Sequence, residues 1–532
     1  MLSFETEVLI IGSGLAGLRA AIESARNGAK TMVISKSPMT GSNSALAGGG
    51  LSVVNETMDG DAHIKETLKI GKGLNDRQLV TELAQGGEKE VEFLREVGVD
   101  LMVHPPFGYF VDRKNSPVKM LGGRILVNKM IQEALKYGQI QFLPHFFVYK
   151  ILAEEGRVSG ILGFDADGRS CAISSQATVL ATGGGGAIYK RNDNHQKALG
   201  NGYAWALEIG LPLIDMEFVQ FYPFGFAESR LPSAMIYPPF PEEARLLDSE
   251  GNDFLKKHGL EMSLDKLVVT LRDRTSYLIY KGSQEGKVLM DCTRVHEDKW
   301  QEYPLNLFPQ KKFDFKKNSF GIAPLAHFFM GGVRVGPSGE TNMKGLFAAG
   351  EVTGGVHGAN RMGGNSLAEC LVFGAKAGHG ASEYARSHVP GKAASIPDDW
   401  PGDLLTGATG TKKAPKILAG LRAVRDLAWK YAGPVRNERK VKEGLSLIEV
   451  WGQKLKDLDV FQTSDLIFKR ELEVSLLVLK AVLIASLVRK ESRGAFQRED
   501  HPEEGGPEFL KRVSIRMKSG GEDLEVAWKD LQ

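Results

Sequence analysis

The first 35 residues combine an apolar run, a glycine-rich loop and a segment of helical periodicity. Residues 7–11 form the apolar run, and apolar positions recur at helical spacing after the glycines. Between them stands Gly-Ser-Gly-Leu-Ala-Gly at 12–17, the glycine pattern of a dinucleotide-binding turn. Gly12 permits the tight turn, Gly14 lets backbone approach a pyrophosphate, and Gly17 lets the helix pack on the strand. The pattern predicts a strand, a phosphate loop and a helix.

Helical and strand periods follow one another through the next part of the chain. Residues 80–97 and 125–137 have helical spacing, and residues 146–182 alternate as short strands. The last strand runs into four glycines, which places backbone at the carboxyl edge of a sheet, where doubly wound folds bind their ligands. Ala181 and Gly183 are therefore predicted to contact the dinucleotide.

The composition changes between residues 221 and 325, where prolines and aromatic residues cluster and no phosphate loop occurs. The sheet pattern then resumes, and one strand ends in Glu351, an acid suited to a ribose hydroxyl. We therefore predict an α/β chain with a Rossmann-like nucleotide-binding domain, an inserted α+β capping domain and a C-terminal helical domain. The predicted boundaries are 1–220 with 326–388 for the discontinuous binding domain, 221–325 for the cap, and 389–532 for the linker and helical domain.

The end of the chain is predicted to be helical. A stretch rich in Gly, Lys and Pro at about 388–415 has the composition of a linker. Helical patterns follow at 417–432, 438–457 and 465–490, and a charged, irregular end is expected after Glu491.

A glycine-dense loop near residue 360 carries one cation, Arg361, and turns into a helical pattern at Ser366. A loop that feeds a helix N-terminus offers free N–H groups and a positive dipole end. This stretch suits an anionic or polarised ligand group, which Arg361 would face.

Composition limits the remaining possibilities. Lys plus Arg (67) nearly balance Asp plus Glu (65), so no global field favours nucleic acid. The three cysteines are far apart, which argues against disulfides and against an iron–sulfur cluster of the chain's own. The longest apolar run, 474–488, contains Lys480 and is too short to span a membrane. With no signal-peptide pattern, we expect a cytoplasmic protein that holds no metal and reaches a membrane only through a partner.

Several long motifs together resemble one family. They are HGANRMGGNSLAE at 357–369, AHFFMGG at 326–332, DMEFVQ at 215–220, and ESRGA at 491–495 followed by REDHP at 498–502. With the N-terminal glycine loop, they make the chain similar to the succinate dehydrogenase / fumarate reductase flavoproteins, a family that also contains L-aspartate oxidase. The resemblance covers essentially the whole length.

The resemblance implies FAD as cofactor. The positions that match the family's FAD-binding residues are Gly12, Ser13, Gly14, Ala16, Gly17, Lys36, Ser42, Gly49, Asp215, Glu351, Ser366 and Leu367. In the family's dehydrogenases a histidine attaches the flavin covalently, and Asn43 stands at that position here. An amide cannot form this bond, so we predict noncovalent FAD in contact with Asn43.

The resemblance also implies hydride exchange between the flavin and a carbon next to a carboxylate. His327 and Arg361 match the family's carboxylate-binding residues, and Arg272 matches its proton-delivering arginine. An arginine has a pKa above ~12, so it shuttles protons only if a relay reloads it. Glu242 and Arg245 match that relay.

Two departures change the expected substrate site. Tyr222-Pro-Phe-Gly stands where the family has His-Pro-Thr-Gly, and Pro241 replaces a threonine. A Gly-Glu-Gly-Gly segment after Arg245 is missing. Two donors to a second substrate carboxylate are therefore lost. Tyr222, whose hydroxyl can donate one hydrogen bond, and Phe224 suit a larger or less charged group.

The leading hypothesis is a fumarate reductase- or succinate dehydrogenase-like enzyme that interconverts an unsaturated and a saturated carboxylate. Because the chain has no cluster cysteines, it would exchange electrons with a separate iron–sulfur or other redox partner. Two alternatives stay open: a stand-alone enzyme similar to L-aspartate oxidase, and a flavin electron-transfer subunit with a decayed substrate site.

Overall fold

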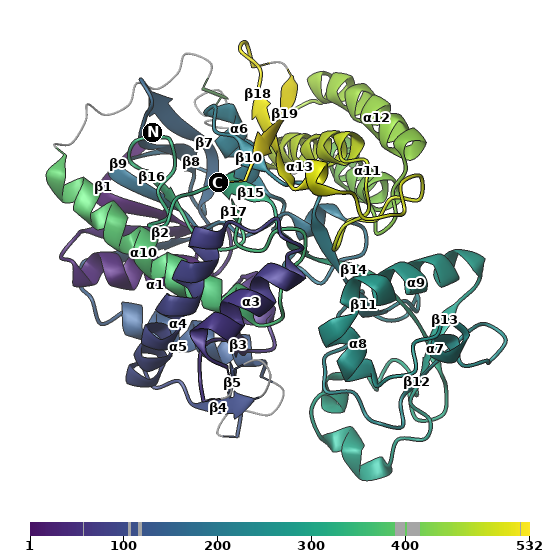
Figure 1. Ribbon diagram of the computed structural model, residues 1–532. Helices are drawn as coiled ribbons and strands as arrows, with labels where there is room; N and C mark the ends of the chain where they lie inside the picture. The colour runs from purple at the N-terminus through teal and green to yellow at the C-terminus, as the bar shows by residue number, and fades with distance from the viewer. Residues whose placement is uncertain are drawn as a thin grey trace.

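The computed structural model describes residues 1–56, 58–104, 108–114, 120–388, 400–401, 415–521 and 523–531. Figure 1 shows a large lobe built around a sheet, with a group of C-terminal helices against one side. A smaller lobe, coloured teal, is joined to the large one through two strands.

A seven-stranded sheet forms the centre of the large lobe. Its strands are β1 (Leu2–Ile11), β2 (Thr31–Ser35), β6 (Ile140–Pro144), β7 (Phe147–Glu154), β8 (Arg157–Phe164), β9 (Ser170–Leu180) and β16 (Leu346–Ala348). The order is β6-β2-β1-β9-β8-β7, with β16 beside β9. Strands β6, β2, β1, β9 and β16 pair in parallel, and β7 and β8 add antiparallel pairs. The buried end of β1 is uniformly apolar, as parallel sheets covered on both faces require.

Helices cover this sheet, and a small second sheet lies beside them. The helices are α1 (Leu15–Arg26), α2 (Asn43–Leu46), α3 (Gly60–Ile70), α4 (Arg77–Glu96), α5 (Gly122–Ala134), α6 (Asn201–Glu208) and α10 (Asn365–Ser387). The small sheet has the order β3 (Gly50–Ser52), β5 (Gly108–Val111) and β4 (Leu101–His104). Helix α1 packs against both α10 and α5, and α10 also contacts α4 (Figure 1).

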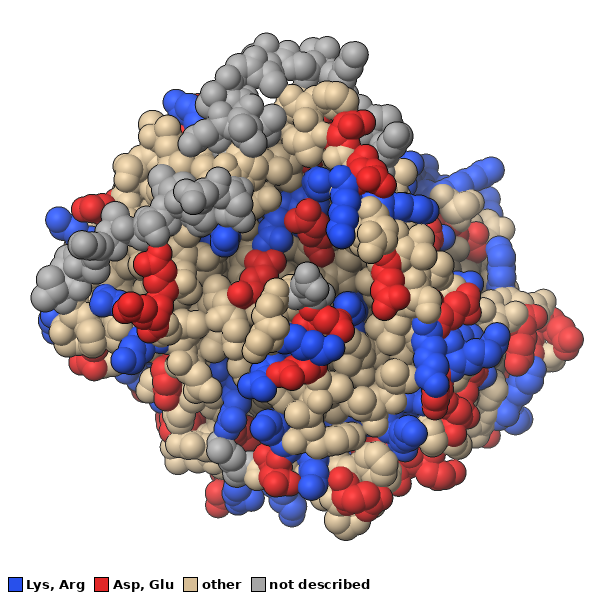
Figure 2. Space-filling view, turned by 90° about the horizontal axis from the view of Figure 1, so that it is seen from above, with Lys and Arg blue, Asp and Glu red and all other residues tan. Residues whose placement is uncertain are grey.

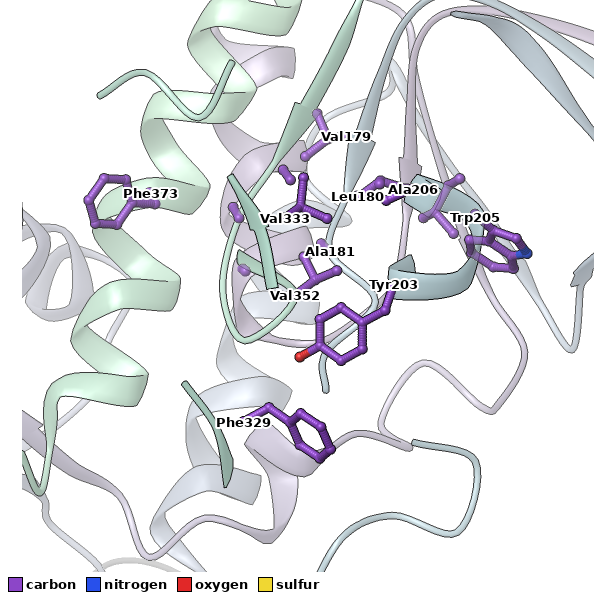
Figure 3. Packing of buried hydrophobic residues seen from close by; sticks show 14 of the residues in the cluster. Val179, Leu180, Ala181, Tyr203, Trp205, Ala206, Phe329, Val333, Val352 and Phe373 are labelled. Atoms are coloured by element: carbon purple, nitrogen blue, oxygen red, sulfur yellow. The ribbon is translucent and has the colours of Figure 1, made fainter. Parts of the chain in front are cut away.

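The core continues from the sheet to the strand that leads into the small lobe. Figure 3 shows Ala181, which follows β9, and Val352 near Tyr203 of α6, and the Tyr203 ring centre lies 5.7 Å from that of Phe329. The Tyr203 hydroxyl donates to the backbone oxygen of Glu351 at 2.8 Å. This buried hydrogen bond fixes the backbone at a residue predicted to bind the cofactor.

The small lobe has its own sheet and its own apolar cluster. It contains β11 (Val219–Phe226), β12 (Arg245–Leu247), β13 (Val288–Asp291), β14 (Phe320–Phe329), α7 (Phe254–Lys257), α8 (Leu264–Thr270) and α9 (Arg272–Glu285). The strand order is β11-β14-β13-β12. The rings of Phe226, Phe308, Phe315 and Phe320 pack edge to face or tilted in its centre.

The C-terminal part combines three helices with a hairpin. The helices are α11 (Pro415–Tyr431), α12 (Glu438–Lys456) and α13 (Thr463–Val488), close to the predicted ranges. A sheet of order β17 (Thr353–Gly354), β15 (Gly332–Arg334), β10 (Leu213–Ile214), β18 (Lys511–Met517) and β19 (Leu524–Asp530) follows. The expectation of an irregular end holds for residues 491–506 but is wrong for the hairpin, because Val513 and Ile515 alternate as buried residues and β18 pairs with β10.

Short 3-10 turns complete the elements, at η1 (Gly186–Ile188), η2 (Glu297–Gln301), η3 (Leu305–Leu307) and η5 (Pro507–Phe509). The predicted linker at 388–415 lies outside the described residues except at its ends and at 400–401. Within the described ranges, no helix has the length and apolar content that crossing a membrane requires. On the face seen in Figure 2, basic and acidic side chains are interspersed.

Candidate active site

A cavity of about 1020 Å³ lies at the carboxyl ends of β1, β2 and β9 and extends to the small lobe. It brings together most of the predicted site residues. Those that line it are Gly12, Ser13, Gly14, Ala16, Lys36, Ser42, Asn43, Gly49, Ala181, Gly183, Tyr222, Arg272, His327, Glu351, Arg361, Ser366 and Leu367. Four predicted residues do not line it: Gly17, Asp215, Glu242 and Arg245.

The N-terminal glycine loop is as tight as the sequence pattern predicts. A Cβ added to Gly12, whose φ is +124°, would lie 2.0 Å from the carbonyl oxygen of Ala181. A Cβ on Gly17 would lie 2.0 Å from the carbonyl oxygen of Gly12, so Gly17 serves helix packing. Gly14 instead lines the cavity and is the N-cap of α1, with no side-chain cap. Its backbone is open to a ligand at the positive end of that helix.

Three buried hydroxyls point to a polar ligand in this part of the cavity. The oxygens of Ser13, Ser42 and Thr182 have no hydrogen-bond partner among the described residues, and all three residues line the cavity. Unsatisfied buried hydroxyls are costly, so their clustering indicates a bound group that completes their hydrogen bonds. Hydroxyls, open backbone and a helix N-terminus fit the pyrophosphate of a dinucleotide.

Glu351 and Lys36 are the ionisable groups of this region. Glu351 accepts hydrogen bonds from the Phe329 backbone N–H at 3.1 Å and from Asn43 Nδ2 at 3.4 Å. Burial raises the pKa of Glu351 to about 7. Lys36 donates to Asn201 Oδ1, and burial lowers the pKa of Lys36 to about 8. Burial removes water from both groups, and a cofactor ribose and phosphate would supply hydrogen-bond partners in its place.

Asn43 is held on three sides at the first residue of α2. Its Nδ2 donates to Asn194 Oδ1 at 2.6 Å, and its Oδ1 accepts from the His195 backbone N–H at 2.8 Å. The amide is thus fixed in the cavity wall by ordinary hydrogen bonds.

Arg361 is the buried cation of the cavity. Its Nη2 donates to Gln220 Oε1 at 2.9 Å, its guanidinium carbon lies 4.5 Å from the centre of the Phe328 ring, and its Nε has no partner among the described residues. Burial, together with the charge of Arg272, lowers the pKa of Arg361 to about 9. The helix that follows, α10, begins at Asn365 with Gly364 as N-cap, one residue before the predicted start at Ser366.

His327 and Arg272 line the same cavity as Arg361. His327 Nδ1 lies 2.8 Å from Asp193 Oδ2, so the carboxylate accepts from this nitrogen and leaves Nε2 for a ligand. Arg272 donates from Nε to the Val268 carbonyl oxygen at 3.2 Å, and its buried Nη1 has no partner among the described residues. No carboxylate of the described residues forms a salt bridge with either arginine. The arrangement is therefore suited to an anion.

The structure does not bring Glu242, Arg245 or Asp215 to the cavity. Glu242 is exposed, and Arg245, on β12, pairs with Asp291 of β13 at 2.6 Å. The Arg245 guanidinium is thus engaged in this strand pair and not in the cavity. Asp215, with a φ of +58°, accepts from Arg512 at 2.6 Å and from the backbone N–H of Val513.

Sequence patterns do not single out three residues of the site. Asp193 fixes His327, Gln220 holds Arg361, and Thr182 supplies one of the unsatisfied hydroxyls. The polar run Asn-Asp-Asn-His at 192–195 follows the glycine-rich strand end and is a usable signal for Asp193. Gln220 ends the DMEFVQ motif, whose residue pattern alone does not indicate a contact with Arg361.

Comparison with known proteins identifies the family. A family model described as an FAD binding domain matches residues 7–367, and one described as the fumarate reductase flavoprotein C-terminus matches residues 422–532. The chain belongs to the fumarate reductase flavoprotein family. Its cofactor is FAD, and it is an oxidoreductase of the FAD-dependent class. The predicted α/β fold class is confirmed.

Relatives from this family match over nearly their whole lengths. The chain is 32% identical to one of the subunits of the fumarate reductase (CoM/CoB) from Methanothermobacter marburgensis, covering 97% of this chain and 98% of that protein. It is 30% identical to the fumarate reductase flavoprotein subunit of Escherichia coli, covering 99% and 94%. A solved quinol-fumarate reductase with menaquinol superposes with a TM-score of 0.88 at 28% identity, covering 100% and 99%.

Proposed function

We propose that this protein interconverts an unsaturated and a saturated carboxylate, in the manner of a fumarate reductase or succinate dehydrogenase. One observation carries the proposal. Arg361, Arg272 and His327 line the same cavity as the FAD-binding loop, and both arginines have a buried nitrogen without a partner among the described residues. A substrate carboxylate supplies the acceptors that these nitrogens lack.

Arg361, His327 and Arg272 have separate roles. When bound, FAD exchanges a hydride with a substrate carbon. Arg361 and His327 bind the carboxylate, and Asp193 keeps the His327 ring oriented. Arg272 delivers a proton to the neighbouring carbon, and burial lowers its pKa, which makes this guanidinium a better proton donor than an exposed one. Glu242 and Arg245, the relay that the resemblance implies, lie off the cavity, so in this mechanism water that enters the cavity returns the proton to Arg272.

We infer that residues 221–325 act as a cap over the cavity. Tyr222, Tyr237 and Arg272 reach the cavity from this part of the chain, and its apolar cluster is separate from that of the large lobe. Ligand sites between two such bodies exclude water when they close.

We also propose a separate redox partner, with an iron–sulfur protein as the expected kind. The relatives' names describe subunits, and this chain's three cysteines are too far apart to ligate a cluster. Purification of the tagged chain from its own cells should bring down a cysteine-rich protein with iron–sulfur absorbance. Catalytic peroxide formation with L-aspartate by the chain alone would contradict a required partner.

The enzymatic proposal is tested by following the flavin spectrum. The holoprotein is reduced without oxygen, and enoates are added one at a time, beginning with fumarate. Reoxidation by an enoate is the expected result. Arg272→Ala should keep its FAD and lose at least about a hundredfold in this rate. Arg274, exposed on the same helix, provides the matched control Arg274→Ala, which should react normally. Full activity of Arg272→Ala would refute the mechanism.

A further inference from the structure

Tyr222 lies beside His327 but offers a bound anion no hydrogen-bond donor. Its ring centre is 5.7 Å from that of His327, and its hydroxyl donates to the carbonyl oxygen of Ile236 at 3.0 Å. Burial raises the pKa of Tyr222 well above its usual value, so the hydroxyl stays protonated and keeps this bond. The ring, and not the hydroxyl, is therefore what Tyr222 presents next to His327.

The neighbouring cap residues repeat this arrangement. The Tyr237 hydroxyl donates to the Leu46 carbonyl oxygen at 2.8 Å, and its ring centre lies 6.5 Å from that of Tyr303. Met235 and Pro238 also line the cavity. This wall of the cavity thus combines aromatic and aliphatic surface, and the two tyrosine hydroxyls are bonded to backbone oxygens.

Three charged residues also line this side. Asp265 accepts hydrogen bonds from the Phe240 backbone N–H. The Arg113 guanidinium carbon lies 3.4 Å from the centre of the Tyr303 ring, and Lys266 is exposed. Arg113 is the alternative anchor that a dicarboxylate would use, so it enters the test below.

We propose that the substrate is a monocarboxylate enoate whose far end is apolar and planar, with an aromatic ring as the best fit. This inference rests on the proposed function and specifies its substrate class. The carboxylate binds Arg361 and His327, and the apolar group lies against Tyr222 and Tyr237. A second carboxylate against Tyr222 and Tyr237 would lose hydration without gaining a donor from either hydroxyl, whereas an aromatic ring gains contact with two rings.

The reduction is balanced by groups already named. One C=C bond becomes one C–C bond with two new C–H bonds, which requires two electrons and two protons. The electrons come from the redox partner through the FAD cofactor, which would take up one proton from solvent on reduction and pass it to the substrate within the hydride, and Arg272 supplies the other proton. The distal group takes no part in the bond changes and contributes only binding.

Binding and turnover test the inference separately. The dissociation constants of 3-phenylpropanoate and succinate for the oxidised holoprotein are measured by calorimetry, and reoxidation of the reduced protein is measured with cinnamate, crotonate and fumarate. We expect 3-phenylpropanoate to bind at least tenfold more tightly than succinate. Among the three enoates, cinnamate should reach half-saturation of the reoxidation rate at the lowest concentration. Equal or tighter binding of succinate, or half-saturation by fumarate at a concentration equal to or below that of cinnamate, overturns the inference. Failure of every enoate to reoxidise the flavin would refute the proposed function instead, and the two binding constants would still decide the substrate class.

Two variants test which residues of this wall determine the preference for 3-phenylpropanoate over succinate. Tyr222→His places a polar ring at the wall and should lower the preference for 3-phenylpropanoate over succinate at least tenfold. An unchanged preference would overturn the role of Tyr222. Arg113→Ala should lower succinate affinity by less than threefold, and a loss of tenfold or more would identify Arg113 as a dicarboxylate anchor and overturn the inference.

Discussion

The Arg361 guanidinium donates to the Gln220 amide oxygen at 2.9 Å, and this bond begins a chain of fixed amides. Gln220 Nε2 donates to Asn360 Oδ1 at 2.7 Å, and Asn360 Nδ2 donates to Asp273. Because Asp273 accepts, Asn360 must turn its oxygen toward Gln220, which then turns its own oxygen toward Arg361. Asp273 shares this control with the backbone, because the Arg361 N–H also donates to Asn360 Oδ1 at 2.9 Å and Gln220 Nε2 also donates to the Arg361 carbonyl oxygen at 3.1 Å.

Asp273→Asn should weaken carboxylate binding without loss of FAD. The new amide can donate as well as accept, so only the bonds to the Arg361 backbone still fix Asn360 and Gln220, and the bond from the Arg361 guanidinium to Gln220 is weakened. One hydrogen bond to a charged group is worth about 1.5 kcal/mol, or about tenfold in the dissociation constant. Calorimetry with the preferred saturated acid measures this change. Unchanged affinity would show that Asp273 does not act on Arg361.

Glu242→Gln should leave turnover unchanged, because Glu242 is exposed and does not line the cavity. The rate of flavin reoxidation by the best enoate is the measurement, with Arg272→Ala as the inactive reference. A loss of about a hundredfold or more, the range for a removed proton donor, would show that Glu242 acts in the proton relay predicted from the sequence.

Carboxylate affinity should fall as the pH rises through about 9. The pKa of Arg361 is lowered to about 9 by burial, so the free site is cationic below this pH and neutral above it. Because the anion binds the cationic form, the dissociation constant should be constant below about pH 8 and rise about tenfold per unit above about pH 9. Titrations at several pH values, followed through the flavin absorbance, measure this dependence. Constant affinity to about pH 10.5 would contradict the lowered pKa.

FAD should dissociate from the denatured protein, because no covalent bond links the two. Asn43 occupies the position where the family's dehydrogenases carry a histidine, and its amide is already bonded to Asn194 and the backbone of His195. Acid precipitation should release all the flavin to the supernatant, and the chain should keep its mass of 58.1 kDa. A pellet that retains flavin absorbance, with the chain heavier by one FAD, would show a covalent bond elsewhere.

Arg498→Ala should destabilise the fold, because Arg498 bonds to other parts of this chain and is not exposed to a partner. The Arg498 side chain is fully buried, pairs with Asp500 at 2.7 Å and donates to the backbone oxygens of Ser486 and Arg489. We expect a loss of about 3 kcal/mol in the free energy of unfolding, the lower end for breaking a buried ion pair, because Asp500 is partly exposed. Thermal unfolding measures this loss, with exposed Lys490→Ala as the control. Normal stability with impaired partner binding would instead give Arg498 a role in docking the partner.

Local patterns predicted much of the fold. The apolar run at 7–11, the glycines at 12–17 and the helix after them all interact within about twenty residues, so their arrangement follows from nearby sequence. The C-terminal hairpin was missed because β18 is recognisable only through its pairing with β10, about three hundred residues earlier.

The sequence by itself determined the cofactor loop, the cationic residues and the missing histidine at Asn43, because each depends on residue type at one position. Only the tertiary structure decided which charges meet. It paired Arg245 with Asp291, turned Asp215 toward Arg512 and joined Arg361 to Asp273 through two amides. It also bonded the Tyr222 hydroxyl to a backbone oxygen. The physical reason is that a side chain's partners are set by strand pairing and burial across distant segments, where every polar group must find a partner.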